Sequence, residues 1–388
     1  MALKITSITL DNIRGYKHLS LDELGNLVII VGPNAVGKTN VIEAIQLLTS
    51  ASSFRKPSWT ELVSWDNRQG YALIHLEEDK RHLEHRLVVS ENNHLYEVNG
   101  KKKTPAAIRG SLPCVLFIPD DLQLIKASSA RRRDAIDALA VQLSKNYSSL
   151  KSDYQQALKQ RNLLLKEGIH EGSLFDSWDE SFSVHGARLC LARWRLFDRL
   201  FARMTTIYGD VVPQERLAAR YIPSWERFDS EQRQVGDTDQ YQPGDDSSAL
   251  TLEELQRELL EQSQSLAEAE LRRGISLVGP HKDEMAFFIN ERNARLFASQ
   301  GQQRTIVLVM KLACVELVNE LMGTEPVLLL DDVMSELDEK HRNALTAFIE
   351  KNVQTFITTT NLDYFSPDIL DHATIVRVPI EGTRHEYR

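Results

Sequence analysis

The chain has 388 residues, of which 42% are hydrophobic and 26% are charged. These values fit a folded globular protein of two or three domains and argue against a mainly disordered chain. The formal net charge of −9 argues against nucleic-acid binding by the field of the whole molecule, but a local basic patch is compatible with it.

Targeting signals and cysteine chemistry are not evident. No apolar run approaches the roughly 20 residues that cross a bilayer, and the charged N-terminus does not resemble a secretory signal. Cys114, Cys190 and Cys314 are far apart and lack the spacing of metal ligands or redox pairs. We therefore expect buried, reduced thiols in a cytoplasmic protein that does not enter a membrane.

The N-terminal part of the chain predicts strands and one helix. Helical spacing of apolar residues over 41–48 follows a continuous apolar strand, and a hairpin over 96–103 turns on Asn99-Gly100. Alternating or continuous apolar patterns predict strands over 3–13, 27–31, 72–76, 83–89 and 115–118.

The middle of the chain changes to a helical period. One long helix is expected over 131–167, and after Gly168 and Gly172 a second helix carries an apolar stripe over 175–200. The two predict an antiparallel helical hairpin, a lobe inserted into an α/β domain. The acidic, polar segment 229–248 predicts a mobile loop.

The C-terminal part returns to α/β character. After a helix over 252–273, strands are expected over 275–278, 327–330, 355–359 and 374–378, a hairpin over 285–297, and helices over 303–321 and 339–351. The expected organisation is an α/β domain in two halves, 1–118 and 274–388, around a helical lobe at 119–273 that contains the acidic loop.

The segment Gly32-Pro33-Asn34-Ala35-Val36-Gly37-Lys38-Thr39 matches the phosphate-loop pattern G-x-x-x-x-G-K-[ST], and Asn40 follows it. Its glycines let backbone N–H groups surround phosphate oxygens at a helix N-terminus. Lys38 would contact the β- and γ-phosphates, and the Thr39 hydroxyl would bind Mg²⁺. A plain glycine turn is the alternative, which the complete motif disfavours. The sequence predicts that ATP and Mg²⁺ bind here.

An apolar strand at 327–330 ends in Asp331-Asp332. Alone this pattern is weak, but beside a phosphate loop it indicates a Walker B site. Asp331 would hold Mg²⁺, and Asp332 would orient and deprotonate the attacking water. We expect Lys38 and Asp332 to be the catalytic residues.

The segment Ser299-Gln300-Gly301-Gln302-Gln303 opens an amphipathic helix. A serine and a glycine at a helix N-terminus form a natural anion site. A polar helix cap is the alternative. The position of the segment some 30 residues before the acidic pair favours the anion site.

Further segments follow the pattern of one family. They are Asn12-Ile13-Arg14-Gly15-Tyr16, Gly37-Lys38-Thr39-Asn40, Glu43-Ala44-Ile45, 117–122, 131–133, 160–166, 278–283, 299–305 and 328–338. Over nearly its whole length the chain resembles the RecF family of bacterial recombination mediators. These belong to the ATP-binding-cassette class and are related to the heads of SMC proteins.

The resemblance implies a DNA-binding ATPase whose head carries an inserted helical lobe. ATP would lie between two copies, each giving its signature segment, Ser299-Gln300-Gly301-Gln302, to the phosphate loop of the other. Ser335 and Asp338 would belong to the D-loop that crosses this interface. The family acts with RecO and RecR at gapped double- and single-stranded DNA, loads recombinase and supports the SOS response.

The sequence departs from other cassette ATPases at several positions. Asp332 stands where a catalytic glutamate is usual, which implies slow hydrolysis. The usual switch histidine falls at Thr359 or Thr360, and no Q-loop glutamine can be placed. Ala35-Val36 replaces a small or polar pair without expected harm to phosphate binding.

Basic clusters are the candidates for DNA contact. The two main clusters are Lys101-Lys102-Lys103, with Arg109 near the same hairpin, and Arg131-Arg132-Arg133. Arginines 188, 193, 195 and 199 form a third along the second helix. A solvated charged face is the alternative for each. No aromatic platform lies among them, which favours contact with the DNA backbone.

Two other functions stay open from sequence. One is the ATP-binding subunit of a membrane transporter, which the long helical insertion and the signature segment disfavour. The other is an SMC-like ATPase coupled to a nuclease, for which no carboxylate cluster appears outside the Walker B strand.

Overall fold

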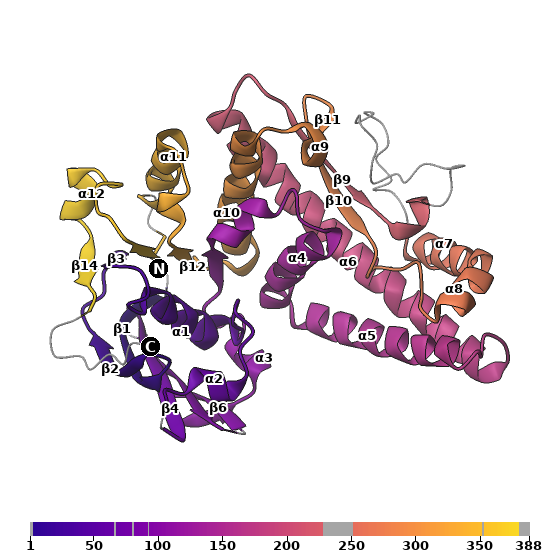
Figure 1. Ribbon diagram of the computed structural model, residues 1–388, viewed down its shortest axis with the longest axis horizontal. Helices are drawn as coiled ribbons and strands as arrows, with labels where there is room; N and C mark the ends of the chain where they lie inside the picture. Colours follow the sequence, from indigo (N-terminus) through magenta and orange to yellow (C-terminus); the bar gives the residue numbers. More distant parts are fainter. Residues whose placement is uncertain are drawn as a thin grey trace. The chain divides into compact units, whose positions relative to one another are not determined.

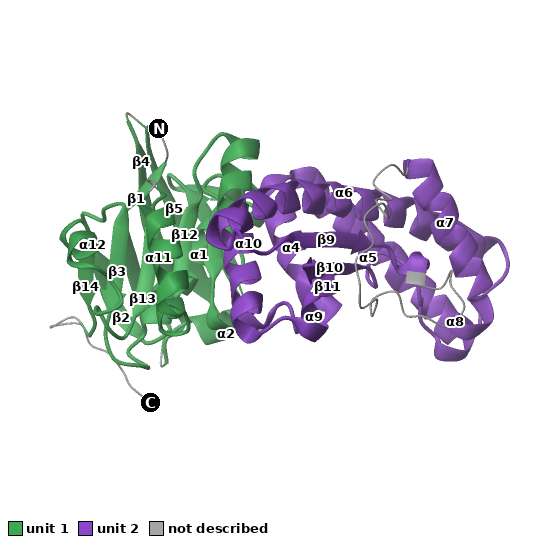
Figure 2. Cartoon of the chain, turned by 90° about the horizontal axis from the view of Figure 1, so that it is seen from above, with its two compact units in different colours: residues 1–121, 314–388 green, residues 122–313 purple. Residues whose placement is uncertain are grey.

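The computed structural model describes residues 3–65, 67–79, 81–91, 93–227, 251–350 and 353–379. The chain forms two compact units, residues 1–121 with 314–388 and residues 122–313 (Figure 2). The sequence placed the second boundary at 273/274 instead of 313/314. The segment expected to be a mobile loop, 229–248, lies outside the described residues.

The first unit contains a five-stranded parallel sheet with the order β14-β3-β13-β12-β8 (Figure 1). Its strands are β3 (Leu27–Val31), β8 (Cys114–Phe117), β12 (Val327–Asp331), β13 (Thr355–Thr359) and β14 (Thr374–Arg377). Their apolar runs are continuous because the middle strands are buried on both faces. The carboxyl ends of β3, β13 and β12 meet at one edge of the sheet, with Val31 opposite Thr359 and Asp331 opposite Thr358.

A second, antiparallel sheet in the same unit has the order β2-β1-β4-β5-β6-β7. Its strands are β1 (Lys4–Ile13), β2 (Tyr16–Leu21), β4 (Gln69–Glu78), β5 (Arg81–Ser90), β6 (Asn93–Val98) and β7 (Lys101–Lys103). The hairpin expected around Asn99-Gly100 joins β6 to β7, with Glu97 opposite Lys102. Both turn residues have positive φ, 49° and 71°, which suits Asn-Gly.

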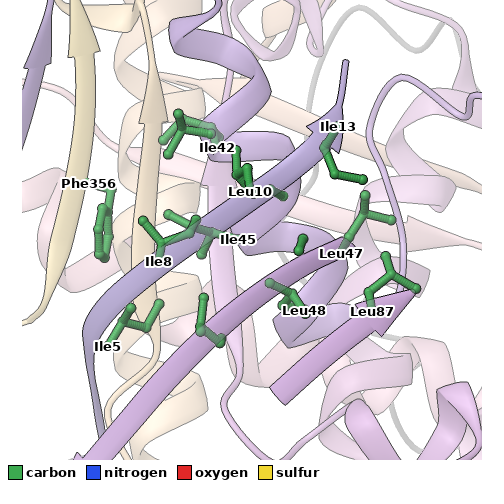
Figure 3. Close-up of a cluster of buried hydrophobic side chains, with 14 of the residues drawn as sticks. Ile5, Ile8, Leu10, Ile13, Ile42, Ile45, Leu47, Leu48, Leu87 and Phe356 are labelled. Carbon is green, nitrogen blue, oxygen red and sulfur yellow. The ribbon is translucent and has the colours of Figure 1, made fainter. Parts of the chain in front are cut away.

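Helix α1 (Lys38–Ser50) packs between the two sheets. Ile42, Ile45, Leu47 and Leu48 lie among side chains of the antiparallel sheet, and Phe356 of β13 completes the cluster (Figure 3). Each fully buried side chain of this size contributes about 1.5–3 kcal/mol to folding. This core therefore holds the start of α1 firmly at the edge where the parallel strands end.

Short elements complete the first unit. They are α2 (Trp59–Leu62), α3 (Pro105–Ile108), the 3₁₀ helix η4 (Val333–Ser335), α11 (Glu339–Ile349) and α12 (Pro367–Asp371). Another 3₁₀ helix, η1 (Pro119–Gln123), spans the boundary at residue 121.

The second unit contains the helical hairpin, with one difference from the expected pattern. The helix expected over 131–167 is two helices, α4 (Ser129–Leu143) and α5 (Lys145–Lys166). Ser144 between them is extended, and its side chain accepts a hydrogen bond from the backbone N–H of Tyr147, so it starts a new helix. The returning helix α6 (Ser173–Val211) runs for 39 residues.

A three-stranded sheet, with the order β11-β10-β9, packs in this unit and was only partly expected. Its elements and their neighbours are β9 (Leu217–Ile222), η2 (Ser224–Arg227), α7 (Leu252–Ser265), α8 (Ala267–Arg273), β10 (Glu284–Ile289), β11 (Arg292–Asn293), α9 (Ala294–Phe297) and the first part of α10 (Gln300–Met322). Because β10 pairs with β9 along its length, residues after 274 belong to the second unit.

The strand expected over 275–278 does not form. Side-chain oxygens accept the hydrogen bonds that the backbone N–H groups of this segment would donate to a neighbouring strand. Ser276 N donates to Asn162 Oδ1 at 2.7 Å, and Leu277 N donates to Glu270 Oε1 at 2.7 Å. Long-range polar contacts therefore replace a strand ladder here. Within the described part of the chain, no helix is both long and apolar enough to span a bilayer.

Candidate nucleotide-binding site

The phosphate loop joins β3 to α1 at the carboxyl edge of the parallel sheet. Gly32 N donates to Thr359 O at 3.2 Å, so the loop starts against the end of β13. A Cβ added at Gly32 would lie 2.1 Å from Val378 O, and therefore only glycine fits. Gly37 has φ 97° and Ala35 has φ 66°, the left-handed turns that wrap the loop. The tip of the loop, Pro33-Asn34-Ala35, is exposed.

Lys38 begins α1 and is buried. Its Nζ donates to Gly32 O at 2.8 Å and to Pro33 O at 2.7 Å. Burial lowers the pKa of Lys38, whereas the charges of Asp332 and Asp331 oppose that shift. The ammonium group thus lies inside the loop, facing two carboxylates across the site.

Asp331 ends β12 and is 7% exposed. It accepts a hydrogen bond from Thr358 Oγ1 at 2.7 Å. Thr39 stands in the first turn of α1, at the same edge of the sheet. A carboxylate and a hydroxyl beside a phosphate loop are the oxygen donors that Mg²⁺ takes, so these residues fit the ion.

Asp332 follows with φ 53°, in the left-handed region. Its N–H donates to Thr358 Oγ1 at 2.9 Å. Its Oδ1 is buried and has no hydrogen-bond partner among the described residues. Burial raises the pKa of Asp332, and Lys38 counteracts this. A buried carboxylate oxygen with free bonding capacity is suited to accept a proton from a water molecule.

Sequence reasoning missed Thr358, although it contacts both acidic residues. Little in the sequence singles it out, because it is one of several threonines at the end of β13. Thr359 is buried, and its hydroxyl donates to Asn361 O at 3.0 Å and accepts from Asn361 N at 3.3 Å. Thr360 is exposed. The two candidate switch positions therefore differ in accessibility, and Thr360 is the one open to solvent.

The expected D-loop residues bracket the turn after β12. Ser335 Oγ donates to Asp332 O at 2.8 Å. Asp338 caps α11, since it accepts from His341 N at 3.0 Å, and its Oδ1 lies 2.7 Å from His341 Nδ1. The segment is thus fixed at both ends to elements of the first unit.

The sequence also did not predict that two arginines contact the same glutamate of α1. Arg14 forms two hydrogen bonds of 2.9 Å with the carboxylate of Glu43, which is buried in α1. Arg55 Nη1 donates to Asn40 Oδ1 at 2.9 Å and lies 3.4 Å from Glu43 Oε2. These contacts tie the β1–β2 turn and the segment after α1 to the first turns of that helix.

The signature segment lies in the second unit, at the start of α10. Ser299 and Gln302 form a reciprocal cap: Ser299 N donates to Gln302 Oε1 at 2.8 Å, and Gln302 N donates to Ser299 Oγ at 3.2 Å. Ser299, Gln300 and Gly301 are exposed. The segment is therefore an ordered, accessible helix N-terminus.

The basic clusters differ in exposure. Lys101, Lys102 and Lys103 form the exposed edge strand β7, and Arg131 is exposed at the start of α4. Arg132 is 4% exposed and forms a bidentate pair with Glu284, with both distances 2.8 Å. This corrects the expectation that Arg132 contacts DNA, because its charge is already used inside the unit.

Two further arginines that were expected to contact DNA also bind groups inside the second unit. Arg133 is half-buried and donates to Asp283 O at 2.5 Å. Arg193, from the third cluster, is buried and pairs with Asp137 at 2.8 Å. Of the basic residues singled out from sequence, the exposed ones are Lys101, Lys102, Lys103, Arg131 and arginines 188, 195 and 199 of α6.

A parallel sheet with a phosphate loop at its carboxyl edge, and an acidic strand end beside that loop, define an ATP-binding-cassette type of ATPase head. The model of the RecF/RecN/SMC N terminal domain family matches residues 4–377. The chain belongs to the RecF family.

Relatives and solved structures agree with this assignment. DNA replication and repair protein RecF of Geobacillus thermodenitrificans is 36% identical, over 96% of this chain and 97% of its own. Two solved structures of the recombination mediator protein RecF in the RecFOR pathway, one with ATPrS and one with ATP, are each 30% identical to the chain. The first covers 94% of both chains with a TM-score of 0.81, and the second covers 93% of this chain and 94% of its own with a TM-score of 0.78.

Proposed function

We propose that the chain is an ATP-dependent DNA-binding protein of recombinational repair and replication. Two copies bind ATP between them and close on DNA at single-strand gaps or junctions, and slow hydrolysis releases the DNA. The observation that carries this proposal is the buried, unpartnered Oδ1 of Asp332 beside Lys38 at the end of the phosphate loop. Solved relatives described as RecF-ATP and RecF-ATPrS support ATP as the ligand.

Different residues of the first unit would bind the triphosphate, hold Mg²⁺ and accept the proton of the attacking water. Backbone N–H groups of residues 32–39 and the Lys38 ammonium bind and neutralise the triphosphate. Mg²⁺ would be held by Thr39 and Asp331 and would supply further positive charge to the phosphates. Thr358 fixes Asp331 through its hydroxyl and holds the backbone of Asp332. Asp332 then accepts a proton from the attacking water.

The proposed slow rate rests on the length of the Asp332 side chain. Asp332 is one methylene shorter than the glutamate usual at this position, so its carboxylate reaches less far toward a water near the γ-phosphate. This shorter reach favours a switch that holds ATP over an enzyme with rapid turnover.

The dimer is proposed from the signature segment. Ser299, Gln300 and Gly301 are exposed at a helix N-terminus, where backbone N–H groups and the helix dipole favour anions. A second copy of the chain would place this terminus against the γ-phosphate bound by the first. Ser335 and Asp338 would lie along the same interface, and Thr360 is the candidate switch residue because it is exposed.

Partners and pathway are proposed from the family. Relatives described as DNA replication and repair proteins, and solved structures placed in the RecFOR pathway, support a role in repair with RecO and RecR. The role in the SOS response is proposed from the family resemblance alone. Lys101, Lys102, Lys103 and Arg131 are the proposed contacts to the DNA backbone, since they are exposed and positively charged.

Asp332→Asn tests the ATP-driven dimer. The amide keeps the shape of the side chain but cannot accept a proton, so hydrolysis should fall on the order of a hundredfold or more while ATP still binds. Static light scattering with saturating MgATP should show the variant accumulating as a dimer. Lys38→Met is the matched control, and it should bind no ATP and stay monomeric. An Asp332→Asn variant that binds ATP but remains monomeric would contradict the dimer.

A further inference from the structure

Helix α9 (Ala294–Phe297) exposes two large apolar side chains next to the signature segment. Leu296 is 49% exposed and Phe297 is 55% exposed, and Ala298 alone separates Phe297 from Ser299. Single apolar side chains are common on protein surfaces, whereas two in adjacent positions beside a functional segment indicate a contact surface. We call Leu296 and Phe297 the α9 ridge.

Buried polar side chains hold α9 at both ends. At its start, the side chain of Asn293 accepts a hydrogen bond from Arg295 N at 2.9 Å. At its end, Gln303 Nε2 donates to Ala298 O at 2.9 Å. Asn293 and Gln303 are 3% and 4% exposed, and Ala294 is fully buried. The position of the ridge is therefore fixed by residues other than Leu296 and Phe297.

A hollow of about 410 Å³ lies beside the ridge. Phe297 forms part of its wall, and so does Gln302 of the signature segment, whose side chain caps Ser299 N. A partly apolar hollow that shares a wall with the signature segment is suited to receive a protruding group from another molecule. Its lining residues are Ile289, Asn290, Arg292, Phe297, Ala298 and Gln302.

The tip of the phosphate loop, Pro33-Asn34-Ala35, is an exposed group of this kind in the first unit. Two of its three residues are apolar. Its backbone is held from below, because Lys38 Nζ donates to Gly32 O at 2.8 Å and to Pro33 O at 2.7 Å. The loop thus presents a largely apolar tip whose shape is set before any partner binds.

We propose that the α9 ridge of one copy packs on the tip of the phosphate loop of a second copy. This contact rests on the proposed ATP-driven dimer and deepens it by assigning an apolar part to the interface. In that dimer the signature segment of one copy meets the phosphate loop of the other. The ridge adjoins the first segment and the loop tip belongs to the second, so the two apolar surfaces come together. Two-fold symmetry makes the contact twice.

The dissociation constant of the MgATP dimer tests the proposal, measured by sedimentation equilibrium on the full chain carrying Asp332→Asn. Phe297→Ala should weaken the dimer about a hundredfold, since each of the two symmetric contacts loses apolar burial equivalent to about a factor of ten. Phe297→Leu keeps an apolar side chain and should retain most of the affinity. Leu174→Ala is the matched control, because Leu174 of α6 is 58% exposed in the same unit, and it should change nothing.

A double substitution tests the assigned partner surface. Ala35→Asn places an amide at the loop tip, and asparagine tolerates the left-handed φ of 66° found there. Ala35→Asn should weaken the dimer by itself. Phe297→Ala added to it should then cost much less than Phe297→Ala alone, because the contact is already lost. Fully additive effects would place the ridge against some other surface and overturn the assignment.

Two further measurements separate this contact from the proposed function. A fluorescent ATP analogue, titrated at protein concentrations too low for dimers, should bind Phe297→Ala and its parent equally, which also shows that the variant is folded. If the Asp332→Asn parent stays monomeric with MgATP, the proposed dimer itself fails. If the parent dimerises and Phe297→Ala dimerises as tightly, the ridge assignment is wrong. An unchanged dimer that loses affinity for gapped DNA would assign the ridge to DNA instead.

Discussion

A buried carboxylate oxygen at the nucleotide site of the first unit keeps unused bonding capacity, whereas the buried Arg161 of the second unit has partners for all three nitrogen atoms of its guanidinium. Asp332 Oδ1 is buried without a partner among the described residues. In contrast, Arg161 donates to Asp179 at 2.7 Å and to the hydroxyls of Ser263 and Ser276 at 2.6 and 2.7 Å. It also lies 2.7 Å from Glu270. The first arrangement suits a ligand, and the second suits architecture.

Buried ion pairs such as that of Arg193 connect helices and strands of the second unit. Arg193 pairs with Asp137 of α4 through contacts of 2.8 and 3.2 Å and donates to Pro280 O at 2.7 Å. Arg132 of the same helix α4 pairs with Glu284 at the start of β10. These ion pairs join α4, α6 and the segment before β10, which are distant in the chain. A basic run in the sequence can therefore hold a fold together instead of binding DNA.

The largest effect should come from breaking this network with Arg193→Met. The methionine fills similar volume but leaves Asp137 buried beside one fewer cation, so the free energy of unfolding should fall by about 3–5 kcal/mol. Urea denaturation followed by circular dichroism would measure it. Arg195→Met removes an exposed arginine from the same helix and should change stability by less than about 0.5 kcal/mol. Equal losses in the two variants would contradict the structural role of Arg193.

A second, smaller effect depends on pH. His281 lies in the second unit, with Nδ1 2.6 Å from the Tyr154 hydroxyl and Nε2 3.2 Å from Ser276 O. Nε2 therefore donates to the carbonyl and Nδ1 accepts from the tyrosine, which is the neutral imidazole. Burial lowers the pKa of His281 to about 4, below the value of about 6.5 in an unfolded chain.

The sign of the linkage follows from proton binding. Between pH 6.5 and pH 4 the unfolded chain binds a proton that the folded chain does not, so stability is full above this window and falls as the pH drops. The loss should reach about 2–3 kcal/mol by pH 4.5. His281→Gln can keep both hydrogen bonds without titrating, so the difference in unfolding free energy between variant and wild type should shift with pH. A constant difference from pH 7 to pH 4.5 would exclude His281 as the titrating group.

The contrast between the two units also explains which features the sequence could predict. Residues 32–39 and Asp331-Asp332 form contiguous motifs whose chemistry depends on local backbone geometry, so the sequence could predict them as a candidate site. The pairs Arg132–Glu284 and Arg193–Asp137 join residues 152 and 56 positions apart, and no local pattern encodes them. The Arg131-Arg132-Arg133 run could therefore not be divided from sequence into exposed and buried members.

The errors in secondary structure have the same origin. An apolar pattern over 275–278 predicted a strand, but Asn162 and Glu270 bind its N–H groups from elsewhere in the unit. Ser144 divides the expected long helix because its side chain caps the next one, although the apolar period continues across it. Thr358 was missed since its importance comes from a neighbouring strand, β12, and not from its own sequence context.

The smallest effect concerns exposed charge that the fold does not use. Lys102 lies in β7 opposite Glu97, on the edge strand of the antiparallel sheet. Lys102→Ala should weaken DNA binding only a few-fold and equally for all sequences, since a phosphate contact carries no base information. The slope of log affinity against log salt should decrease by about 1. Fluorescence anisotropy with gapped DNA at several salt concentrations, in the presence of MgATP, would measure both quantities.

Lys159→Ala, which removes an exposed lysine from α5, is the matched control for this measurement. It changes the net charge by the same amount, so a general field effect would alter both variants alike. A specific contact would change the salt slope for Lys102→Ala alone. Identical slopes in the two variants would place the DNA surface elsewhere, with Arg131 the next side chain to substitute because it is exposed beside the buried Arg132.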